Sequence, residues 1–201
     1  MRDASTASRP QTACRRYFRF AAFALALPLA ACGGVLPDTY DLAAAKPQLT
    51  RPFSARLRIA EPLVTTDLDS DRILVRAGPR QMARLAGAKW PERLPFLVQA
   101  RLVESFRSAG LGRQVSLDPA APADYELELD LRRFELNVAR ARVEVVVAAK
   151  LLSAKGRIVA AQNFTADAPV ASTETANVVA AMNGALASVL KRLVAFAATR
   201  L

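Results

Sequence analysis

The chain has 201 residues, with 28 lysines and arginines against 18 carboxylates, no histidine and two cysteines. Without histidine, Ser-His and Cys-His catalytic sites and imidazole metal sites are excluded. The net charge of +10 indicates a partner of negative charge, and nucleic acid is the usual first candidate for so basic a chain.

Residues 1–31 have the pattern of a secretory signal peptide. A basic segment containing Arg15 and Arg16 precedes an uncharged run of twelve residues from Phe20 to Ala31. A transmembrane helix needs about 20 apolar residues, whereas a shorter run is typical of a signal-peptide core. We therefore expect residues 1–31 to be removed.

The motif Leu29-Ala30-Ala31-Cys32 resembles the lipobox of bacterial lipoproteins. In that motif the cysteine is acylated, for example with palmitate, and the chain is cut just before it. We predict lipidation of Cys32; the alternative is an ordinary cleavage site with an incidental cysteine. Gly33, standing where an aspartate would indicate the inner membrane, favours the outer membrane by analogy with enteric sorting.

The export route is left open by the sequence. Arg15-Arg16 partly matches a twin-arginine signal, but Arg19 and Phe20 depart from its usual continuation, so the general secretory route is the alternative. Cleavage would remove Cys14 and leave 170 residues with a net charge of +6. A secreted, anchored protein does not meet nucleic acid, so we expect an anionic membrane surface or an acidic partner.

Residues 32–52 are predicted to be the acylated cysteine and a flexible tether. The stretch after Cys32 is rich in alanine, contains Pro37, Pro47 and Pro52, and has neither helical nor alternating periodicity. Its twenty residues would span about 65 to 70 Å if fully extended. We expect a single folded domain over residues 53–201.

The first half of that domain predicts strands followed by a helix. Apolar residues alternate with arginines over 55–59, which is typical of a half-buried strand. A second extended run over 72–76 stops at Gly78-Pro79, and 81–87 is expected to return toward Trp90 as a hairpin. Helical spacing from Pro95 to Ala109, ended by Gly110, predicts a helix.

The second half predicts an antiparallel meander. Apolar residues occupy odd positions over 125–131 and even positions over 134–138. This change of phase at Arg132-Arg133 predicts a β-bulge that absorbs one residue. Strands over 142–152 and 158–166 should follow, joined by a turn at Lys155-Gly156.

An apolar stripe at helical spacing predicts a long amphipathic helix over 172–199. The stripe could dock a partner or lie on a bilayer, but a helix after a meander usually covers its bare face. Gly184 in this helix predicts close packing against the sheet. Together, the elements predict an α+β fold in which two amphipathic helices cover one face of an antiparallel sheet of four to five strands.

No catalytic, cofactor-binding or metal-binding residue is indicated. The remaining carboxylate cluster alternates along the strand over 125–138, where it is expected to be solvated; its members are Glu126, Glu128 and Asp130. We expect Arg132 and Arg133 to neutralise Asp130 and Glu135. The sequence predicts that the protein is not an enzyme.

In their order and spacing, several short motifs resemble the ABC-type transport auxiliary lipoproteins, the family of the paraquat-inducible protein C type. They are Tyr40-Asp41-Leu42, Arg72-Ile73, Arg76, Trp90, Leu94-Pro95, Ala123-Asp124-Tyr125-Glu126-Leu127, Phe134, Gly156, Phe164 and Ala180-Ala181-Met182-Asn183-Gly184-Ala185-Leu186. The stretch 82–85 departs from the pattern, since aromatic residues are expected there.

The resemblance implies a non-enzymatic lipoprotein on the periplasmic face of the outer membrane. It would partner a mammalian-cell-entry-domain protein and its ABC transporter in moving lipid across the periplasm. The alternatives are a lipid-carrier module that holds an acyl chain and a structural envelope lipoprotein. Assembly into a homo-oligomer is left open.

Three residues are candidates for the contact with that partner: Trp90, Arg72 and Arg76. Tryptophan and arginine are the commonest anchors of protein interfaces. The alternative for Trp90 is a place in the core beside the first helix.

Overall fold

The computed structural model describes residues 36–49 and 52–201, which form nine strands and two helices. The strands are β1 (Asp38–Thr39), β2 (Leu57–Ile59), β3 (Leu63–Val64), β4 (Arg72–Gly78), β5 (Gln81–Lys89), β6 (Val115–Ser116), β7 (Tyr125–Asn137), β8 (Arg142–Ser153) and β9 (Ile158–Pro169). The helices are α1 (Leu94–Ser108) and α2 (Thr175–Ala198).

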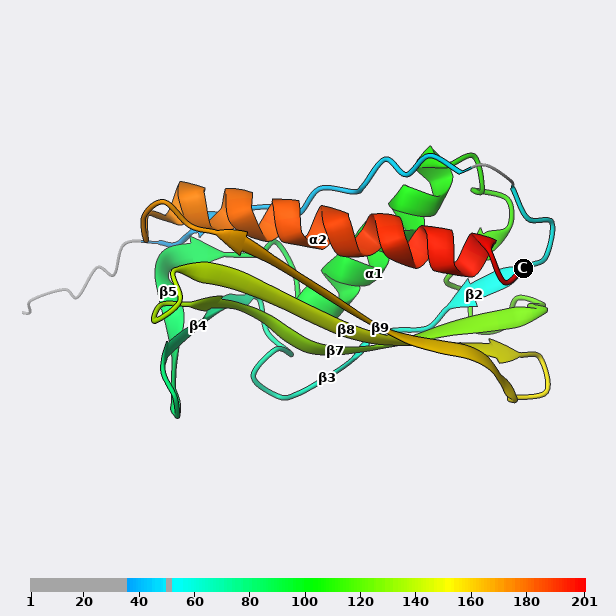
Figure 1. Cartoon of the computed structure of the whole chain (residues 1–201), viewed down its shortest axis with the longest axis horizontal. Helices are drawn as coiled ribbons and strands as arrows, with labels where there is room; N and C mark the ends of the chain where they lie inside the picture. Colours follow the sequence, from blue (N-terminus) through cyan, green and yellow to red (C-terminus); the bar gives the residue numbers. More distant parts are fainter. Residues whose placement is uncertain (1–35, 50–51) are drawn as a thin grey trace, which may run out of the picture. The chain divides into compact units, whose positions relative to one another are not determined.

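Strand β7 is the centre of the sheet (Figure 1). On one side it pairs antiparallel with β8, which pairs with β9. On its other side β2, β3 and β4 follow one another along its length, all parallel to it. The chain from 57 to 76 therefore accompanies β7 from its first residues to its last.

The sheet is mixed and has nine strands in the described part of the chain, so the prediction of four to five antiparallel strands is wrong. The antiparallel meander β7–β8–β9 is as expected. What the sequence did not reveal is the parallel pairing of β2 and β4, whose partners in β7 lie 68 and 61 residues further along the chain. The α+β class with two helices is confirmed.

The predicted bulge in β7 is confirmed. Leu131 lies opposite Val147 and Arg133 lies opposite Val146, so Arg132 is the extra residue. The bulge restores the alternation, because Leu131 before it and Phe134 after it both face the core and are 1% exposed.

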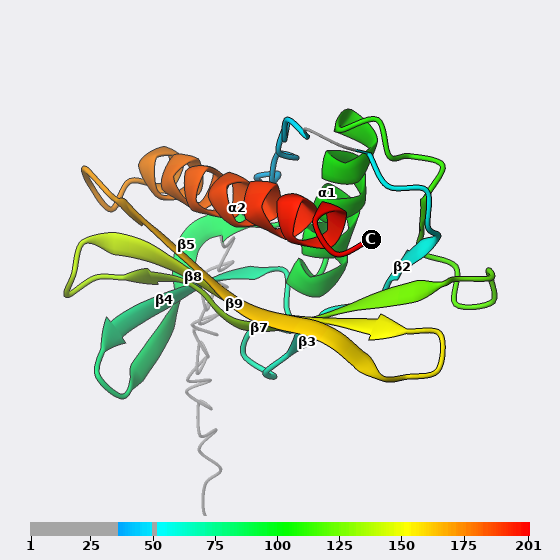
Figure 2. The same cartoon turned by 45° about the vertical axis from the view of Figure 1, so that its right-hand side comes forward.

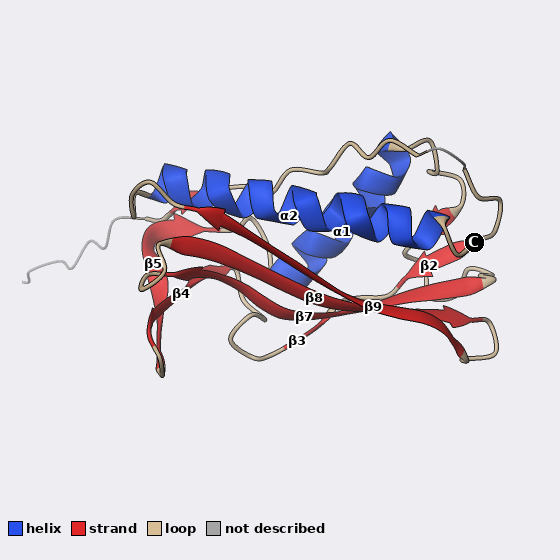
Figure 3. Cartoon of the chain, viewed as in Figure 1, coloured by secondary structure: helices blue, strands red, loops and turns tan. Residues whose placement is uncertain are grey.

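Both helices cover the same face of the sheet, as Figures 1 and 3 show. Pro95 lies in the first turn of α1, and Gly110, with φ of +81°, follows its last turn as the sequence predicted. Helix α2 packs along β8 and β9. Its apolar stripe faces the core, as residues such as Val178, Leu186 and Val189 are 0% exposed.

Helix α2 is long and apolar enough to cross a membrane by length and composition, but half of its most apolar window is buried inside the fold. The role of a core helix is therefore confirmed over docking to a partner or a bilayer. The expected close contact at Gly184 is wrong. A Cβ at Gly184 would meet no atom within 4 Å, because this residue lies on the exposed side of the helix.

Residues 38–49 do not form a flexible tether. They pack on the domain: β1 pairs with Ala88 and Lys89 of β5, and Leu42 and Ala45 are each 2% exposed. The lack of periodicity in this stretch reflects an extended segment held by other elements. Residues 35–201 form one compact unit with its own apolar core, whereas the predicted signal peptide and Cys32 lie outside the described residues.

Candidate functional site

The hairpin of β4 and β5 carries two of the three predicted contact residues, Arg72 and Arg76. It projects from the sheet on the side away from the helices (Figures 1 and 2). A two-residue turn, Pro79-Arg80, joins its strands at the pair Gly78 and Gln81. Between the pairs Arg72–Lys89 and Leu74–Arg84 the register shifts, because β5 carries a bulge in which Gly87 has a φ of +69°. Glycine tolerates that value without strain.

The hairpin contains five cations and no carboxylate over residues 72–89, and we call it the cationic hairpin. Its cations are Arg72, Arg76, Arg80, Arg84 and Lys89. From residue 36 onward the chain has a net charge of +6, so the cationic hairpin accounts for all but one unit of that charge.

Arg76 is committed to an ion pair inside the domain. Its Nε lies 2.6 Å from Glu135 Oε1, and its second nitrogen donates to Oε2 at 3.0 Å. The Glu135 side chain is 2% exposed, and the hydrogen bond to it raises the pKa of Arg76. Since a buried carboxylate needs a partner, Arg76 serves the fold before any contact with another molecule.

Trp90 is 1% exposed, which places it in the core as the alternative interpretation held. Its ring stacks edge-on against Phe134 with centroids 6.0 Å apart. Its backbone N–H donates to the carbonyl of Asp71 at 2.7 Å. Only Arg72 of the three predicted contact residues is both exposed and without an ion pair in the described part of the chain.

The neutralisation predicted for the arginine pair in β7 is half correct. Arg132 pairs with Asp130 at 2.8 Å, as expected. Arg133 pairs instead with Glu144 at 3.0 Å, because the bulge turns it toward β8 and leaves Glu135 to Arg76.

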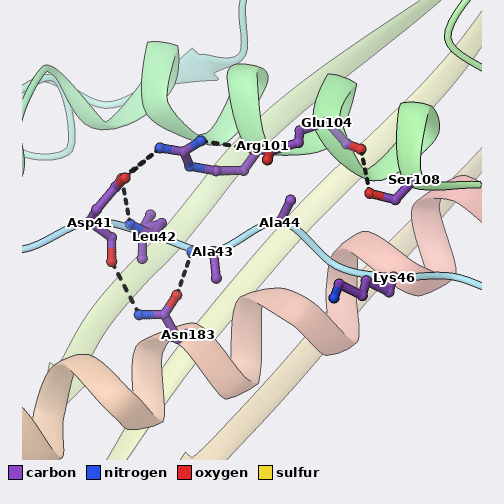
Figure 4. A pocket seen from close by; sticks show the side chains of 9 residues that line it. All are labelled: Asp41, Leu42, Ala43, Ala44, Lys46, Arg101, Glu104, Ser108 and Asn183. Carbon is purple, nitrogen blue, oxygen red and sulfur yellow. Dashed lines mark hydrogen bonds and ion pairs between the residues drawn. The ribbon is translucent and has the colours of Figure 1, made fainter.

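A second constellation holds the N-terminal segment between the two helices (Figure 4). The side chain of Asn183 in α2 accepts from the N–H of Ala43 at 2.6 Å and donates to the carbonyl of Asp41 at 3.3 Å. An amide can satisfy an extended backbone in this way because it carries both a donor and an acceptor.

Helix α1 grips the same segment from the other side. Arg101 donates to both carboxylate oxygens of Asp41, at 2.8 and 2.6 Å, and this hydrogen bonding raises the pKa of Arg101. Ser105, which is 0% exposed, accepts from the N–H of Ala45 at 2.9 Å. We call these four side chains, Asp41, Arg101, Ser105 and Asn183, the polar clasp.

The polar clasp borders an open pocket of about 430 Å³. Its remaining walls include Lys46, Glu104 and Ser108 (Figure 4). Within residues 36–49 and 52–201, no group of three or more histidine, cysteine, aspartate or glutamate side chains could hold a metal ion. What the arrangement can do is fix the path of the N-terminal segment.

A third polar contact joins the start of β7 to β2. Asp124 accepts from the backbone N–H of Arg56 at 2.8 Å and from its guanidinium, also at 2.8 Å. These hydrogen bonds lower the pKa of Asp124 to about 2. The carboxylate thereby aligns β2 for parallel pairing with β7.

Sequence reasoning missed the polar clasp as a unit. Asn183 and Asp41 both belong to the motifs that carry the family resemblance, but 142 residues separate them. The signal that was available is an asparagine in the middle of an alanine-rich helix, where the residue is unfavourable without a specific bond.

The sequence of the chain is similar to a protein family and to a bacterial relative. A family model described as "ABC-type transport auxiliary lipoprotein component" matches residues 40–194. An uncharacterized protein of Bradyrhizobium diazoefficiens is 32% identical over 162 residues, which are 78% of this chain and 43% of that protein. The chain therefore spans less than half the length of this curated relative.

Two solved structures share the fold. A crystal structure of a protein from Xanthomonas campestris has a TM-score of 0.72 and 30% identity, covering 81% of this chain and 95% of the other. A crystal structure of an uncharacterized protein has a TM-score of 0.64 and 15% identity, covering 79% and 97%.

Proposed function

Because this chain belongs to the family of ABC-type transport auxiliary lipoprotein components, we propose that it is a non-enzymatic lipoprotein of the periplasmic face of the outer membrane. It serves an ABC-type lipid transport system together with a mammalian-cell-entry-domain protein. Acylation of Cys32 attaches it, since each buried CH₂ contributes about 0.8 kcal/mol and several chains hold firmly.

The single observation that carries the proposal is the match of the family over residues 40–194, which begins directly after β1. The matched region contains all four residues of the polar clasp, including Asp41 and Asn183. Asn183 bonds the backbone at positions 41 and 43 and Arg101 bonds the Asp41 side chain. The path of the chain directly after Tyr40 is thereby fixed on the folded domain.

The folded domain lies closer to an anchor at Cys32 than a twenty-residue tether would require. Only five residues lie between Cys32 and Asp38 in β1, and the six steps of chain span about 20 Å when extended. The partner must therefore come close to the outer membrane. A periplasm-spanning component fits this requirement, and Arg72 stays our candidate for its contact.

The charged lining of two pockets favours an auxiliary component over a lipid carrier. An acyl chain needs an apolar lining. The pocket at the polar clasp is lined by charged residues such as Lys46, Arg101 and Glu104. A second pocket, of about 460 Å³, opens between β7 and the loop at 119–123 and contains Arg58, Glu126 and Glu128.

The proposal is tested by expressing the full chain with a C-terminal tag in its own host. We expect it in the outer-membrane fraction, and we expect detergent extraction to co-purify a mammalian-cell-entry-domain protein. Cys32→Ala should release the chain from the pellet, and Arg72→Glu should reduce partner recovery without lowering the melting temperature. An unacylated chain that stays in the pellet, or a partner of another class, would refute it.

A further inference from the structure

We propose that the cationic hairpin is a second membrane contact, which lays the domain against anionic phospholipid headgroups next to its lipid anchor. The proposal rests on the proposed acylation of Cys32 for its geometry, and on the charge and position of the hairpin for its chemistry.

The first argument is position. Strand β1 pairs with Ala88 and Lys89 at the base of the hairpin, and Cys32 lies six residues before β1. An anchor at Cys32 therefore holds the base of the hairpin within about 20 Å of the lipid surface.

The second argument is unbalanced charge. Arg80 at the turn and Arg84 in β5 are exposed, and neither has an ion pair in the described part of the chain. The guanidinium of Arg84 donates to the backbone carbonyl of Asp67 at 2.7 Å, which holds it in place without cancelling its charge. Of the acidic residues that adjoin the hairpin, Asp38 and Asp71 lie at its base. Glu135 pairs with Arg76, and Asp67 contacts Arg84 through its backbone carbonyl and forms no ion pair with it.

The third argument is the direction of the hairpin. It projects away from the face that the two helices cover (Figures 1 and 2). Its tip can meet a surface without disturbing the apolar layer between sheet and helices. With the acyl chains, it would provide two separated points of attachment, and two points restrict the tilt of the domain where one point leaves it free.

A lipid surface fits the hairpin better than an acidic protein groove. A groove requires shape complementarity at a buried anchor, whereas no exposed residue near the tip is large and apolar. These residues are Ala77, Pro79, Arg80, Gln81, Ala83 and Arg84. Diffuse attraction between cations and anionic headgroups needs only charge and proximity.

The test uses the chain from residue 33 onward, which lacks the acylation site and contains the whole compact unit of residues 35–201. Co-sedimentation is measured with vesicles of phosphatidylethanolamine and phosphatidylglycerol and with neutral phosphatidylcholine vesicles. We expect binding to the anionic vesicles alone, and its loss when salt is raised enough to shorten the Debye length to a few ångströms.

The double variant Arg80→Ala/Arg84→Ala should bind roughly 25-fold more weakly, since each basic residue near a membrane surface contributes about fivefold in affinity. The matched control is Lys155→Ala/Arg157→Ala, which removes two exposed cations at the β8–β9 turn, the far end of the sheet. The control should bind as the parent does, and all three chains should melt at the same temperature.

Equal weakening in both variants would show a general charge effect and overturn the proposal. Absence of binding of the parent chain to anionic vesicles would also overturn the proposal. If Arg80→Ala/Arg84→Ala then loses a protein partner in the pull-down, the hairpin is a protein interface. Since the chain used with vesicles carries no acyl group, a negative result in this experiment does not bear on the proposed acylation, which the Cys32→Ala fractionation tests separately.

Discussion

The apolar layer between sheet and helices and the polar clasp around residues 41–45 hold the same domain together by different means. The layer consists of large side chains with almost no exposed surface, such as Trp90, Phe134 and Leu186. The clasp consists of a few directed hydrogen bonds, and Asp41 within it keeps 58% of its side-chain surface exposed.

The difference separates the interactions that stabilise the domain from those that fix the position of its N-terminal segment. Burial of apolar surface contributes about 25 cal/mol per Å² and has no direction. A hydrogen bond contributes only about 0.5 to 1.5 kcal/mol but specifies which atoms meet. We infer that the layer keeps the domain folded and that the clasp determines the path of the N-terminal segment.

The largest effect is expected from Trp90→Ala. This change removes a ring that is 1% exposed and stacks on Phe134, so the free energy of unfolding should fall by about 3 to 5 kcal/mol. Urea denaturation followed by circular dichroism measures it, because the variant lacks the only tryptophan. Trp90→Phe should lose less, and an unchanged free energy would place Trp90 outside the layer.

A smaller and local effect is expected from Asn183→Ala. Two hydrogen bonds to the backbone of residues 41 and 43 are lost, which should lower the free energy of unfolding by about 1 to 3 kcal/mol. Amide hydrogen exchange should accelerate at residues 42–46 and stay unchanged at 143–147 in β8.

Asn177→Ala is the matched control for the clasp, because Asn177 bonds only nearby residues of its own helix end. Acceleration spread evenly over the domain in Asn183→Ala would mean that the clasp is part of the global core, and the comparison of the two regions would then fail.

The smallest effect concerns pH. The pKa of Asp124 is lowered from 3.8 to about 2 by its hydrogen bonds with Arg56. A carboxyl group whose pKa is lower in the folded than in the unfolded state stabilises the fold at pH values above its unfolded-state pKa. This stabilisation is lost as the pH falls to the folded-state pKa. The difference in Tm between parent and Asp124→Asn should therefore be present at neutral pH and shrink between about pH 4 and pH 2.

Glu92→Gln controls for the pH experiment, since the exposed Glu92 side chain has no hydrogen bond or ion pair with the described residues. A Tm difference for Asp124→Asn that does not change with pH would mean that the ion pair with Arg56 is not what Asp124 contributes.

Local patterns account for what the sequence by itself determined. Alternation along 125–131 and the change of phase before Phe134 revealed β7 and its bulge at Arg132, because side-chain direction in a strand has a period of two. Helical spacing with Pro95 and Gly110 likewise revealed α1. The family resemblance rested on short motifs, each of which is local in the sequence.

Only the tertiary structure decided what the distant segments do. The parallel pairing of β2 and β4 with β7, the choice of Arg76 as the partner of Glu135, and the packing of residues 38–49 all join positions far apart in the chain. Extended segments without periodicity look alike in sequence whether they are solvated or held. Their path depends on hydrogen-bond partners that another part of the chain supplies, and no local pattern names those partners.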